Sequence, residues 1–256
     1  MTITLNKYVS VITKKNREAD FLLEKLIGWR KNQRFLIVSR SRSGSNMFCS
    51  FLESNPDCFI WREVFQRPQY FSSSITRFLI HGKYLRKFKI VSFKVFYYHT
   101  VPENFWEQTM ANDNVRIIHL VRNNRLGTYV SQREAMANAK WEAFKGNGKQ
   151  RSQTKLKVDT DDLQSFLRRN ETMINGMKNR LQGRRNVLQL SYEELVDGSG
   201  MGKVSNFLQD VLNPKNYGMP KNKKQSVGFV SDKIETIDEV EVTLRKFGWE
   251  HFNTNE

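Results

Sequence analysis

The segment 35–52 constrains the fold more than any other part of the chain. The apolar run Phe35-Leu36-Ile37-Val38 is followed by Arg-Ser-Arg-Ser-Gly-Ser-Asn at 40–46 and by an apolar stripe at 47, 48, 51 and 52. This order predicts a buried strand, a turn of small residues and a helix. The turn leaves backbone N–H groups at the positive end of a helix dipole, and Arg42 adds a cation that can grip a phosphate or sulfate at two points. We therefore predict an anion site made of Arg42, Ser43, Gly44, Ser45 and Asn46.

Two common phosphate-binding signatures are absent. A P-loop NTPase needs G-x-x-x-x-G-K-[ST], and none of the Gly-Lys pairs at 82–83, 148–149 and 202–203 is followed by Ser or Thr. No dinucleotide-binding G-x-G-x-x-G follows the first strand. The loop at 40–46 is thus expected to hold an anion without the usual magnesium machinery. A capped helix behind an edge strand would have the same local sequence, so the rest of the chain must decide.

The net positive charge of the chain indicates that it binds anionic partners or ligands. The 256 residues carry a formal charge of +16, which suits nucleic acid, an anionic membrane surface, or anionic cofactors and substrates. The only cysteines, Cys49 and Cys58, make a disulfide framework improbable and fit a reducing compartment. The first thirty residues contain no continuous apolar segment, and no stretch approaches the length of a membrane span. We expect a single cytoplasmic domain over 1–256.

Strands and helices are expected to alternate along the chain, which predicts an α/β fold with a central, mainly parallel sheet flanked by helices. The expected strands are 34–39, 58–61, 89–97, 115–121 and 187–190. The expected helices are 16–30 within an N-terminal helical extension (1–33), one from 46, 75–80, 104–111, 125–138, one from 160 capped by Thr160, Asp161 and Asp162, one starting near 192, and 236–247. Segments 145–157 and 213–226 are expected to be basic surface loops.

Five side chains suited to chemistry stand at or just past the ends of these strands. They are Arg42, Glu63, Lys94, Arg122 and Tyr192. Because ligands of open parallel sheets bind beyond the carboxyl ends of the strands, the five are expected to share one site.

Four ordered motifs resemble those of sulfotransferases that use 3′-phosphoadenosine 5′-phosphosulfate (PAPS). The likeness runs from about Arg34 to His251 and is greatest to carbohydrate sulfotransferases, particularly the bacterial trehalose-sulfotransferase-like group. The motifs are the loop at 35–46, Ser-Phe-Lys-Val at 92–95, the strand and helix at 115–131, and Leu-Gln-Leu-Ser-Tyr-Glu-Glu-Leu-Val at 188–196. The resemblance implies a P-loop-like sulfotransferase fold, PAPS as donor, 3′-phosphoadenosine 5′-phosphate (PAP) as product, and no metal.

The resemblance also implies roles for the donor-binding residues. Arg42 and the N–H groups of 43–46 would hold the 5′-phosphosulfate, while Arg122 and Ser131 would bind the 3′-phosphate. The spacing from Arg122 to Ser131 is nine residues where the family often has eight, so Asn123 or Thr128 could share that role. Tyr192 would contact the adenine or simply pack. Lys224, in the late basic loop, would close over the donor, although the usual Arg-Lys-Gly of cytosolic members is missing there.

Transfer to a hydroxyl also needs a base, because the attacking hydroxyl loses its proton. The resemblance favours Glu63, with an exposed Glu paired to Arg62 or Arg67 as the alternative. His99 is the second candidate, because cytosolic small-molecule sulfotransferases place a His just past the corresponding strand. Lys94 would neutralise the leaving oxygen, or would be a solvent-facing Lys of an alternating strand. His119 and Cys49 are expected to be core residues.

The acceptor and the competing functions stay open from the sequence. Basic loops and aromatic residues suit a sugar or glycolipid hydroxyl, with peripheral contact to anionic surfaces and no stable nucleic-acid partner. The alternatives are a nucleic-acid-binding protein, a nucleotide kinase of related fold, and a degenerate sulfotransferase that only binds. Neither the acceptor nor the oligomeric state follows from the residues.

Overall fold

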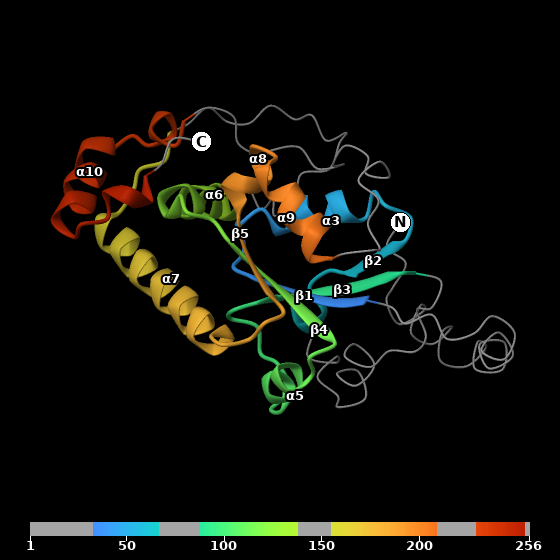
Figure 1. The fold of residues 1–256 in the computed structure, drawn as a ribbon. Helices are drawn as coiled ribbons and strands as arrows, with labels where there is room; N and C mark the ends of the chain where they lie inside the picture. Colours follow the sequence, from blue (N-terminus) through green and yellow to red (C-terminus); the bar gives the residue numbers. More distant parts are fainter. Residues whose placement is uncertain (1–32, 67–87, 138–154, 209–228, 254–256) are drawn as a thin grey trace, which may run out of the picture.

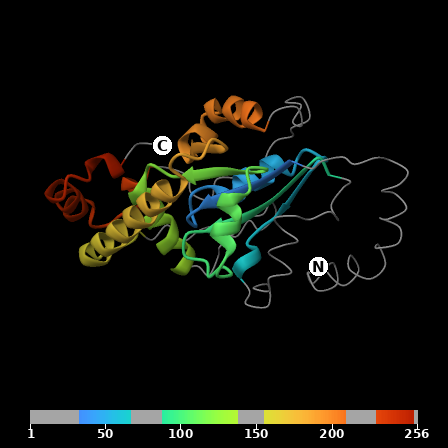
Figure 2. The same ribbon diagram turned by 60° about the horizontal axis from the view of Figure 1, so that its bottom comes forward.

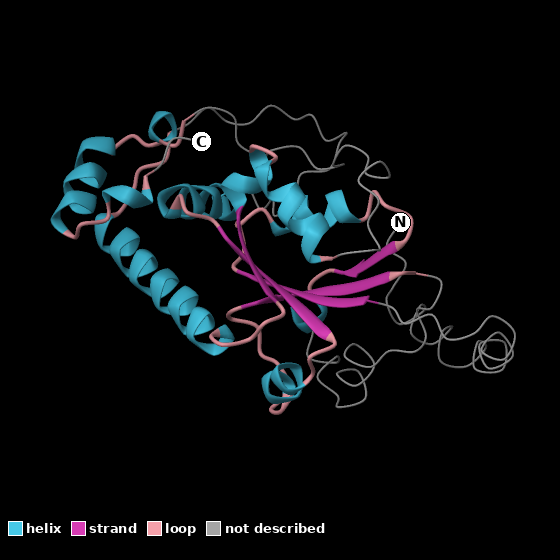
Figure 3. Cartoon of the chain, viewed as in Figure 1, coloured by secondary structure: helices cyan, strands magenta, loops and turns pink. Residues whose placement is uncertain are grey.

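The core of the molecule is a five-stranded parallel sheet with the strand order β2-β3-β1-β4-β5 (Figures 1 and 3). The computed structural model describes residues 33–66, 88–137, 155–208 and 229–253. The strands are β1 (Gln33–Ser39), β2 (Cys58–Trp61), β3 (Ile90–Phe96), β4 (Val115–Val121) and β5 (Val187–Ser191). Parallel pairing brings the carboxyl ends of all five strands to one edge of the sheet.

One face of the sheet is covered by three helices: α3 (Ser45–Leu52), α8 (Tyr192–Val196) and α9 (Ser199–Phe207). Phe48, Cys49 and Leu52 of α3 pack on Phe35 and Ile37 of β1, and all five side chains are buried. The apolar stripe of α3 therefore fixes this helix directly behind the strand it follows, with its N-terminus at the carboxyl edge of the sheet.

The opposite face is covered by α5 (Phe105–Ala111) and by the long helix α7 (Thr160–Leu181), as Figures 1 and 2 show. Phe105 of α5 and Met177 of α7 pack on Leu36, Val38 and Val95. A third cluster joins α6 (Arg125–Ala137) to α7 and α10 (Ile237–Lys246). Three short 3₁₀ segments complete the described elements: η1 (Val64–Gln66), η4 (Ser231–Lys233) and η5 (Glu250–Phe252).

The α/β architecture and all five predicted strands are confirmed, with ends within one residue of the prediction. Two local details were wrong. Asp159 rather than 160–162 caps α7, since its side chain accepts the N–H groups of Asp161 and Asp162. Helix α9 was not predicted, because the glycines at 198, 200 and 202 disfavour helix locally, whereas packing of Val204 against the sheet stabilises it.

Several predictions lie outside the described residues: the helices at 16–30 and 75–80, most of 145–157, and all of 213–226. At 155–157, Leu156 forms a parallel bridge with Ile234, so this end of the predicted loop is tied to the body of the protein. Among the helices of the described ranges, none combines the length and apolar character needed to cross a bilayer.

Candidate active site

The β1–α3 loop is shaped by two residues in the left-handed region, Arg42 (φ 65°) and Gly44 (φ 79°). Gly44 is the N-cap of α3, and the aromatic ring of Tyr192 lies directly against it. A Cβ at Gly44 would lie 2.3 Å from Tyr192 Cδ2, so only glycine fits both the backbone angle and this approach. The N-cap makes no side-chain hydrogen bond and the first turn of α3 has no acidic residue. This helix N-terminus therefore suits an anion.

Arg42 and Arg122, which lie far apart in sequence, meet at the same edge. Arg42 donates from Nε and Nη2 to Ser131 Oγ of α6, at 3.0 and 2.9 Å. Arg122 directly follows β4 and lies 3.5 Å by Nη1 from the carbonyl oxygen of Arg42. Its guanidinium carbon is 4.8 Å from the centre of the Tyr192 ring. The loop, the end of β4, α6 and α8 thus bring two guanidinium groups, a buried hydroxyl and an aromatic face together.

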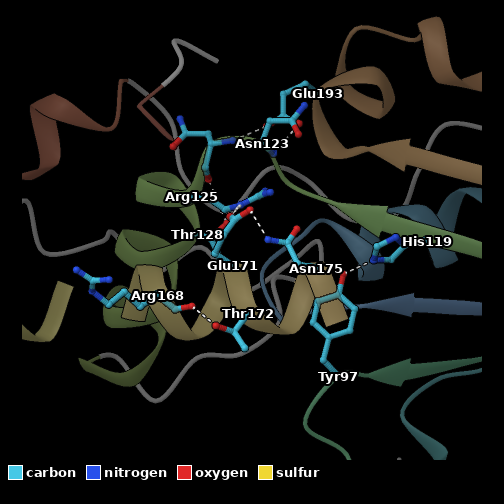
Figure 4. A network of polar contacts seen from close by, with 11 residues as sticks. Tyr97, His119, Asn123, Arg125, Thr128, Arg168, Glu171, Thr172, Asn175 and Glu193 are labelled. Atoms are coloured by element: carbon cyan, nitrogen blue, oxygen red, sulfur yellow. Dashed lines mark hydrogen bonds and ion pairs between the residues drawn. The ribbon is translucent and has the colours of Figure 1, made fainter. Parts of the chain in front are cut away.

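A carboxylate from α8 holds the turn that carries Arg122. Glu193 accepts the backbone N–H groups of Asn123 and Asn124 at 3.1 and 3.0 Å (Figure 4 shows Glu193 beside Asn123). Asn124 caps α6, because its Oδ1 accepts the N–H of Gly127, and Glu193 fixes the turn that leads into this cap. No pattern in the sequence indicated this role of Glu193, because it depends on β4 and β5 being neighbours in the sheet.

A second polar cluster lies at the ends of β2 and β3. Lys94 of β3 is fully buried, and its ammonium group donates to Glu63 Oε1 at 3.0 Å and to Asn46 Oδ1. The Glu63 side chain is 23% exposed, so this carboxylate faces both the buried ammonium and the solvent. Lys94 is therefore not the solvent-facing residue of an alternating strand. Arg62 pairs with Glu53 instead of with Glu63.

His99 and Tyr98 border this cluster. His99 Nδ1 accepts the backbone N–H of Phe96 at 3.2 Å, and burial is the main cause that lowers the pKa of His99. In the neutral ring the proton is therefore on Nε2, and neither nitrogen has a lone pair directed at a substrate. Tyr98 is 50% exposed although its ring packs against Phe96 and His99, so it offers a held aromatic face beside Glu63.

Arg40, which directly follows β1, was not assigned a role from the sequence. Its guanidinium group stacks on Phe166 at 4.1 Å and donates from Nη2 to Gln132 Oε1 at 3.0 Å. Burial lowers its pKa to about 10. It lines a cavity together with Ser43, Tyr97, Arg122, Thr128 and Asn170, among other residues. Its position after a parallel strand was the available signal.

A buried chain of hydrogen bonds lies behind Tyr97, which lines that cavity. Tyr97 Oη and His119 Nε2 are 2.7 Å apart, and His119 Nδ1 is 2.7 Å from Gln189 Oε1 (Figure 4 shows the Tyr97–His119 contact). Burial is the main cause that lowers the pKa of His119 to about 4, so the ring is neutral near pH 7. Gln189 Oε1 can only accept, so Nδ1–H donates to it and the Tyr97 hydroxyl donates to Nε2. His119 is buried, as predicted.

The sequence-predicted residues thus form two neighbouring groups at one edge of the sheet. The first contains the loop 42–46, Arg122, Ser131 and Tyr192, and the second contains Glu63, Lys94 and His99. Asn46 belongs to the anion loop and contacts Lys94, so it connects them. Thr128 donates to the carbonyl oxygen of Asn124 and lines the cavity beside Arg122. Lys224 lies outside the described residues. Across the described ranges, His, Cys, Asp and Glu side chains form no group of three or more suited to a metal ion.

Comparison with known proteins gives only remote likenesses. No protein-family model and no curated protein sequence matches the chain. The solved structures that are similar to it include the following three. Retinol dehydratase in a complex with retinol and PAP is 12% identical with a TM-score of 0.45, covering 92% of this chain and 86% of that one. A sulfotransferase from Alicyclobacillus acidocaldarius is 13% identical with a TM-score of 0.43, and the match covers 88% of this chain and 97% of that one. Sulfotransferase STF9 from Mycobacterium avium is 8% identical with a TM-score of 0.42, and the match covers 92% of this chain and 80% of that one. Likenesses this low establish neither family nor function.

Proposed function

We propose that the protein transfers the sulfuryl group of PAPS to a hydroxyl group of an acceptor. The observation that carries the proposal is the convergence of Arg42, Arg122 and Ser131 at the N-terminal end of α3, beside the Glu63–Lys94 pair. The first group supports binding of a donor with two separate anionic groups. The second supports a proton transfer and a charge neutralisation next to that donor.

In this proposal the N-terminal end of α3 and Arg42 bind the 5′-phosphosulfate, and Arg122 with Ser131 binds the 3′-phosphate. Arg42 bridges both regions, because its backbone belongs to the α3 loop while its guanidinium group reaches Ser131. The Tyr192 ring is buried between Gly44 and Arg122, so in this proposal it positions these two residues next to the donor instead of offering an open face to the adenine.

The transfer step is an in-line displacement at sulfur. The acceptor oxygen forms a bond to sulfur, the bond from sulfur to the bridging phosphate oxygen breaks, and the acceptor proton passes to Glu63. PAP leaves with the electron pair of the broken bond. Protonation of Glu63 removes the negative charge paired with Lys94 at 3.0 Å, so the ammonium charge becomes available to the leaving oxygen.

Glu63 is a better base than His99 for a geometric reason. The Glu63 carboxylate is partly exposed and can accept a proton while one oxygen stays bonded to Lys94. His99 Nδ1 is already occupied by the Phe96 N–H. We therefore assign the proton transfer to Glu63 and a supporting role to His99.

The acceptor is proposed to be a sugar, free or as part of a glycolipid. Tyr98 keeps half of its surface exposed beside Glu63, although its ring is packed on two neighbours. An immobilised aromatic face can stack on the apolar face of a pyranose ring. Such stacking would place a ring hydroxyl close to the carboxylate.

The test is binding of PAP compared with adenosine 5′-monophosphate (AMP), followed by turnover with labelled PAPS. Arg122→Ala should weaken PAP by about ten- to a hundredfold, because a charge-assisted contact is lost, and should change AMP by less than about threefold. Arg245→Ala, which removes an exposed positive charge from α10, is the charge-matched control and should leave both affinities unchanged.

Equal loss of PAP and AMP affinity in the Arg122 variant would refute the 3′-phosphate assignment. Magnesium-dependent phosphoryl transfer from ATP, without sulfation of any glycan, lipid or phenol from labelled PAPS, would favour a nucleotide kinase instead.

A further inference from the structure

The side chain of Asn46 makes a contact that the proposed binding of the donor does not use. Asn46 is the second residue of α3, so its backbone N–H belongs to the helix end that would bind the phosphosulfate. Its side-chain oxygen Oδ1 accepts a hydrogen bond from the ammonium group of Lys94 instead. Through this contact the donor loop touches the Glu63–Lys94 pair.

Lys94 points toward α3 because side chains alternate along β3. Phe93 and Val95 pack in the cluster that contains residues of α5 and α7, whereas Ile90 packs in the cluster that contains α3. Alternation therefore places Lys94 on the same face as Ile90. Lys94 is fully buried there, so its charge must be offset by the groups that surround it.

Within the described part of the chain, the Lys94 ammonium contacts groups of two kinds. Glu63 Oε1, a charged acceptor, lies at 3.0 Å. The amide oxygen of Asn46 and the face of the Phe96 ring, whose centre is 4.7 Å from Nζ, are neutral. When Glu63 takes the proton of the acceptor, only the neutral groups still hold the ammonium without opposing its charge.

We propose that Asn46 is a positioning residue for the transfer step, which holds the Lys94 ammonium beside the donor without cancelling its charge. This inference rests on the proposed function and extends it. After Glu63 is protonated, the amide keeps the ammonium at the N-terminal end of α3, where its charge acts on the leaving phosphate oxygen. A carboxylate at position 46 would hold the ammonium equally well but would neutralise it.

The experiment compares Asn46→Ala and Asn46→Asp in the full chain. PAP affinity is measured by calorimetry, and kcat with labelled PAPS and the acceptor that wild type sulfates fastest in a panel of glycans, lipids and phenols. Asn46→Ala should lower kcat about ten- to a hundredfold and change PAP affinity by less than about threefold, because the backbone N–H stays in place.

Asn46→Asp separates positioning from a structural role. It should lower kcat to a similar extent and weaken PAP by about tenfold or more, because the new carboxylate faces the anionic donor. It should nevertheless be at least as stable as wild type in urea, since a carboxylate is favourable in the first turn of a helix and beside a buried ammonium. A structural role predicts instead that Asn46→Asp keeps the kcat of wild type. This prediction also decides the matter if Asn46→Ala does not fold.

The ¹H–¹⁵N spectrum of protein with ¹⁵N-labelled lysine gives a readout without turnover. A buried, hydrogen-bonded ammonium exchanges its protons slowly with water, and Lys94→Met identifies its signal. Asn46→Ala should broaden this signal. Gln33→Ala is the matched control, because it removes an amide oxygen that accepts from Arg116 at the opposite edge of the sheet. It should change neither the Lys94 signal nor kcat, and an unchanged signal in Asn46→Ala would refute the inference.

The outcomes distinguish this inference from the proposed function. Wild-type protein that neither binds PAP nor sulfates any acceptor contradicts the function itself. Wild-type protein that sulfates an acceptor, with Asn46→Ala at near-normal kcat, contradicts only the role of Asn46.

Discussion

At the scale of single residues, the site depends on a few positions whose environment changes their chemistry. Lys94 is a fully buried ammonium group whose charge is balanced by Glu63. Removing one partner of a buried pair is far more harmful than removing an exposed charge. Gly44 is a second such position, because the backbone angle and the Tyr192 ring both exclude a side chain.

Glu63→Gln should reduce turnover at least about a hundredfold while PAP affinity stays within about twofold, because the amide keeps an oxygen for Lys94 but cannot take the proton. Steady-state sulfation and calorimetry measure the two quantities. Glu53→Gln, which removes a carboxylate paired with Arg62, should keep normal turnover. Near-normal turnover in Glu63→Gln would instead assign the base to His99.

Gly44→Ala should destabilise the protein by about 1–3 kcal/mol and weaken nucleotide binding, because the new Cβ meets Tyr192 in a strained backbone conformation. Gly176→Ala is the matched control, because a Cβ there, on an exposed part of α7, meets no atom within 4 Å. The control should stabilise α7 by about 0.5–1 kcal/mol. Urea unfolding of both variants checks the prediction, and a neutral Gly44→Ala would contradict the observed approach of Tyr192.

At the scale of elements, helix N-termini decide where anions can bind. The N-terminus of α3 has a glycine N-cap without a side-chain bond, whereas Asp159 caps α7 and Asn124 caps α6. Side chains of the protein thus hold the starts of α6 and α7. The start of α9 has a glycine N-cap like that of α3, but α3 begins beside Arg42 and Arg122 in the candidate donor loop. This arrangement supports α3 as the position of the 5′-phosphosulfate.

Glu193→Ala and Asp159→Ala should each cost about 1–2 kcal/mol of unfolding free energy, because each removes a carboxylate that accepts two backbone N–H groups at a helix start. Only Glu193→Ala should also weaken PAP, since Glu193 holds the turn next to Arg122. Unfolding and PAP titration of both variants test this difference. Unchanged PAP affinity in Glu193→Ala would show that Arg122 is positioned without it.

At the scale of the whole molecule, the chain carries a formal charge of +16, and the sheet brings some of its arginines together at the site. Parallel pairing gathers Arg40, Arg42 and Arg122 at one edge of the sheet. A general affinity for polyanions would follow from the total charge alone, but selectivity for a bisphosphate requires this local arrangement. Buried groups of the fold also make its stability depend on pH.

The buried His119 should make the protein sensitive to mild acid. Its pKa is about 4 when folded and about 6.5 when unfolded, so the unfolded chain takes up the proton first as the pH falls. Its stabilising contribution is complete above about pH 6.5, and about 3 kcal/mol of it is lost between pH 7.5 and 4. His99 adds a loss of the same sign, because its pKa is also lowered.

His119→Gln should be less stable than wild type at pH 7.5 but should lose less stability on acidification. His251→Gln, at an exposed position in η5, should retain the acid sensitivity of the wild type. Urea unfolding at pH 7.5 and pH 4.5 measures both. Equal acid sensitivity in all three proteins would refute the assignment to His119.

Much of the fold follows from local patterns. The apolar runs of the five strands are short and bounded by turns, and the stripe at 47–52 has helical spacing, so their ends could be placed within one residue. Helix α9 could not, because three glycines outweigh its apolar residues until the sheet provides a surface to bury them.

By itself, the sequence determined the alternation of strands and helices, the anion loop after β1, and the positions of Arg42, Glu63, Lys94, Arg122 and Tyr192 at strand ends. Only the tertiary structure decided which side chains meet. Lys94 pairs with a residue 31 positions away, and Arg42 contacts one 89 positions away. Such contacts depend on the strand order β2-β3-β1-β4-β5 and its register, since these determine which strand ends are neighbours. Burial then lowered the pKa of Arg40 and placed its guanidinium group on Phe166 of α7, a contact that the local sequence does not indicate.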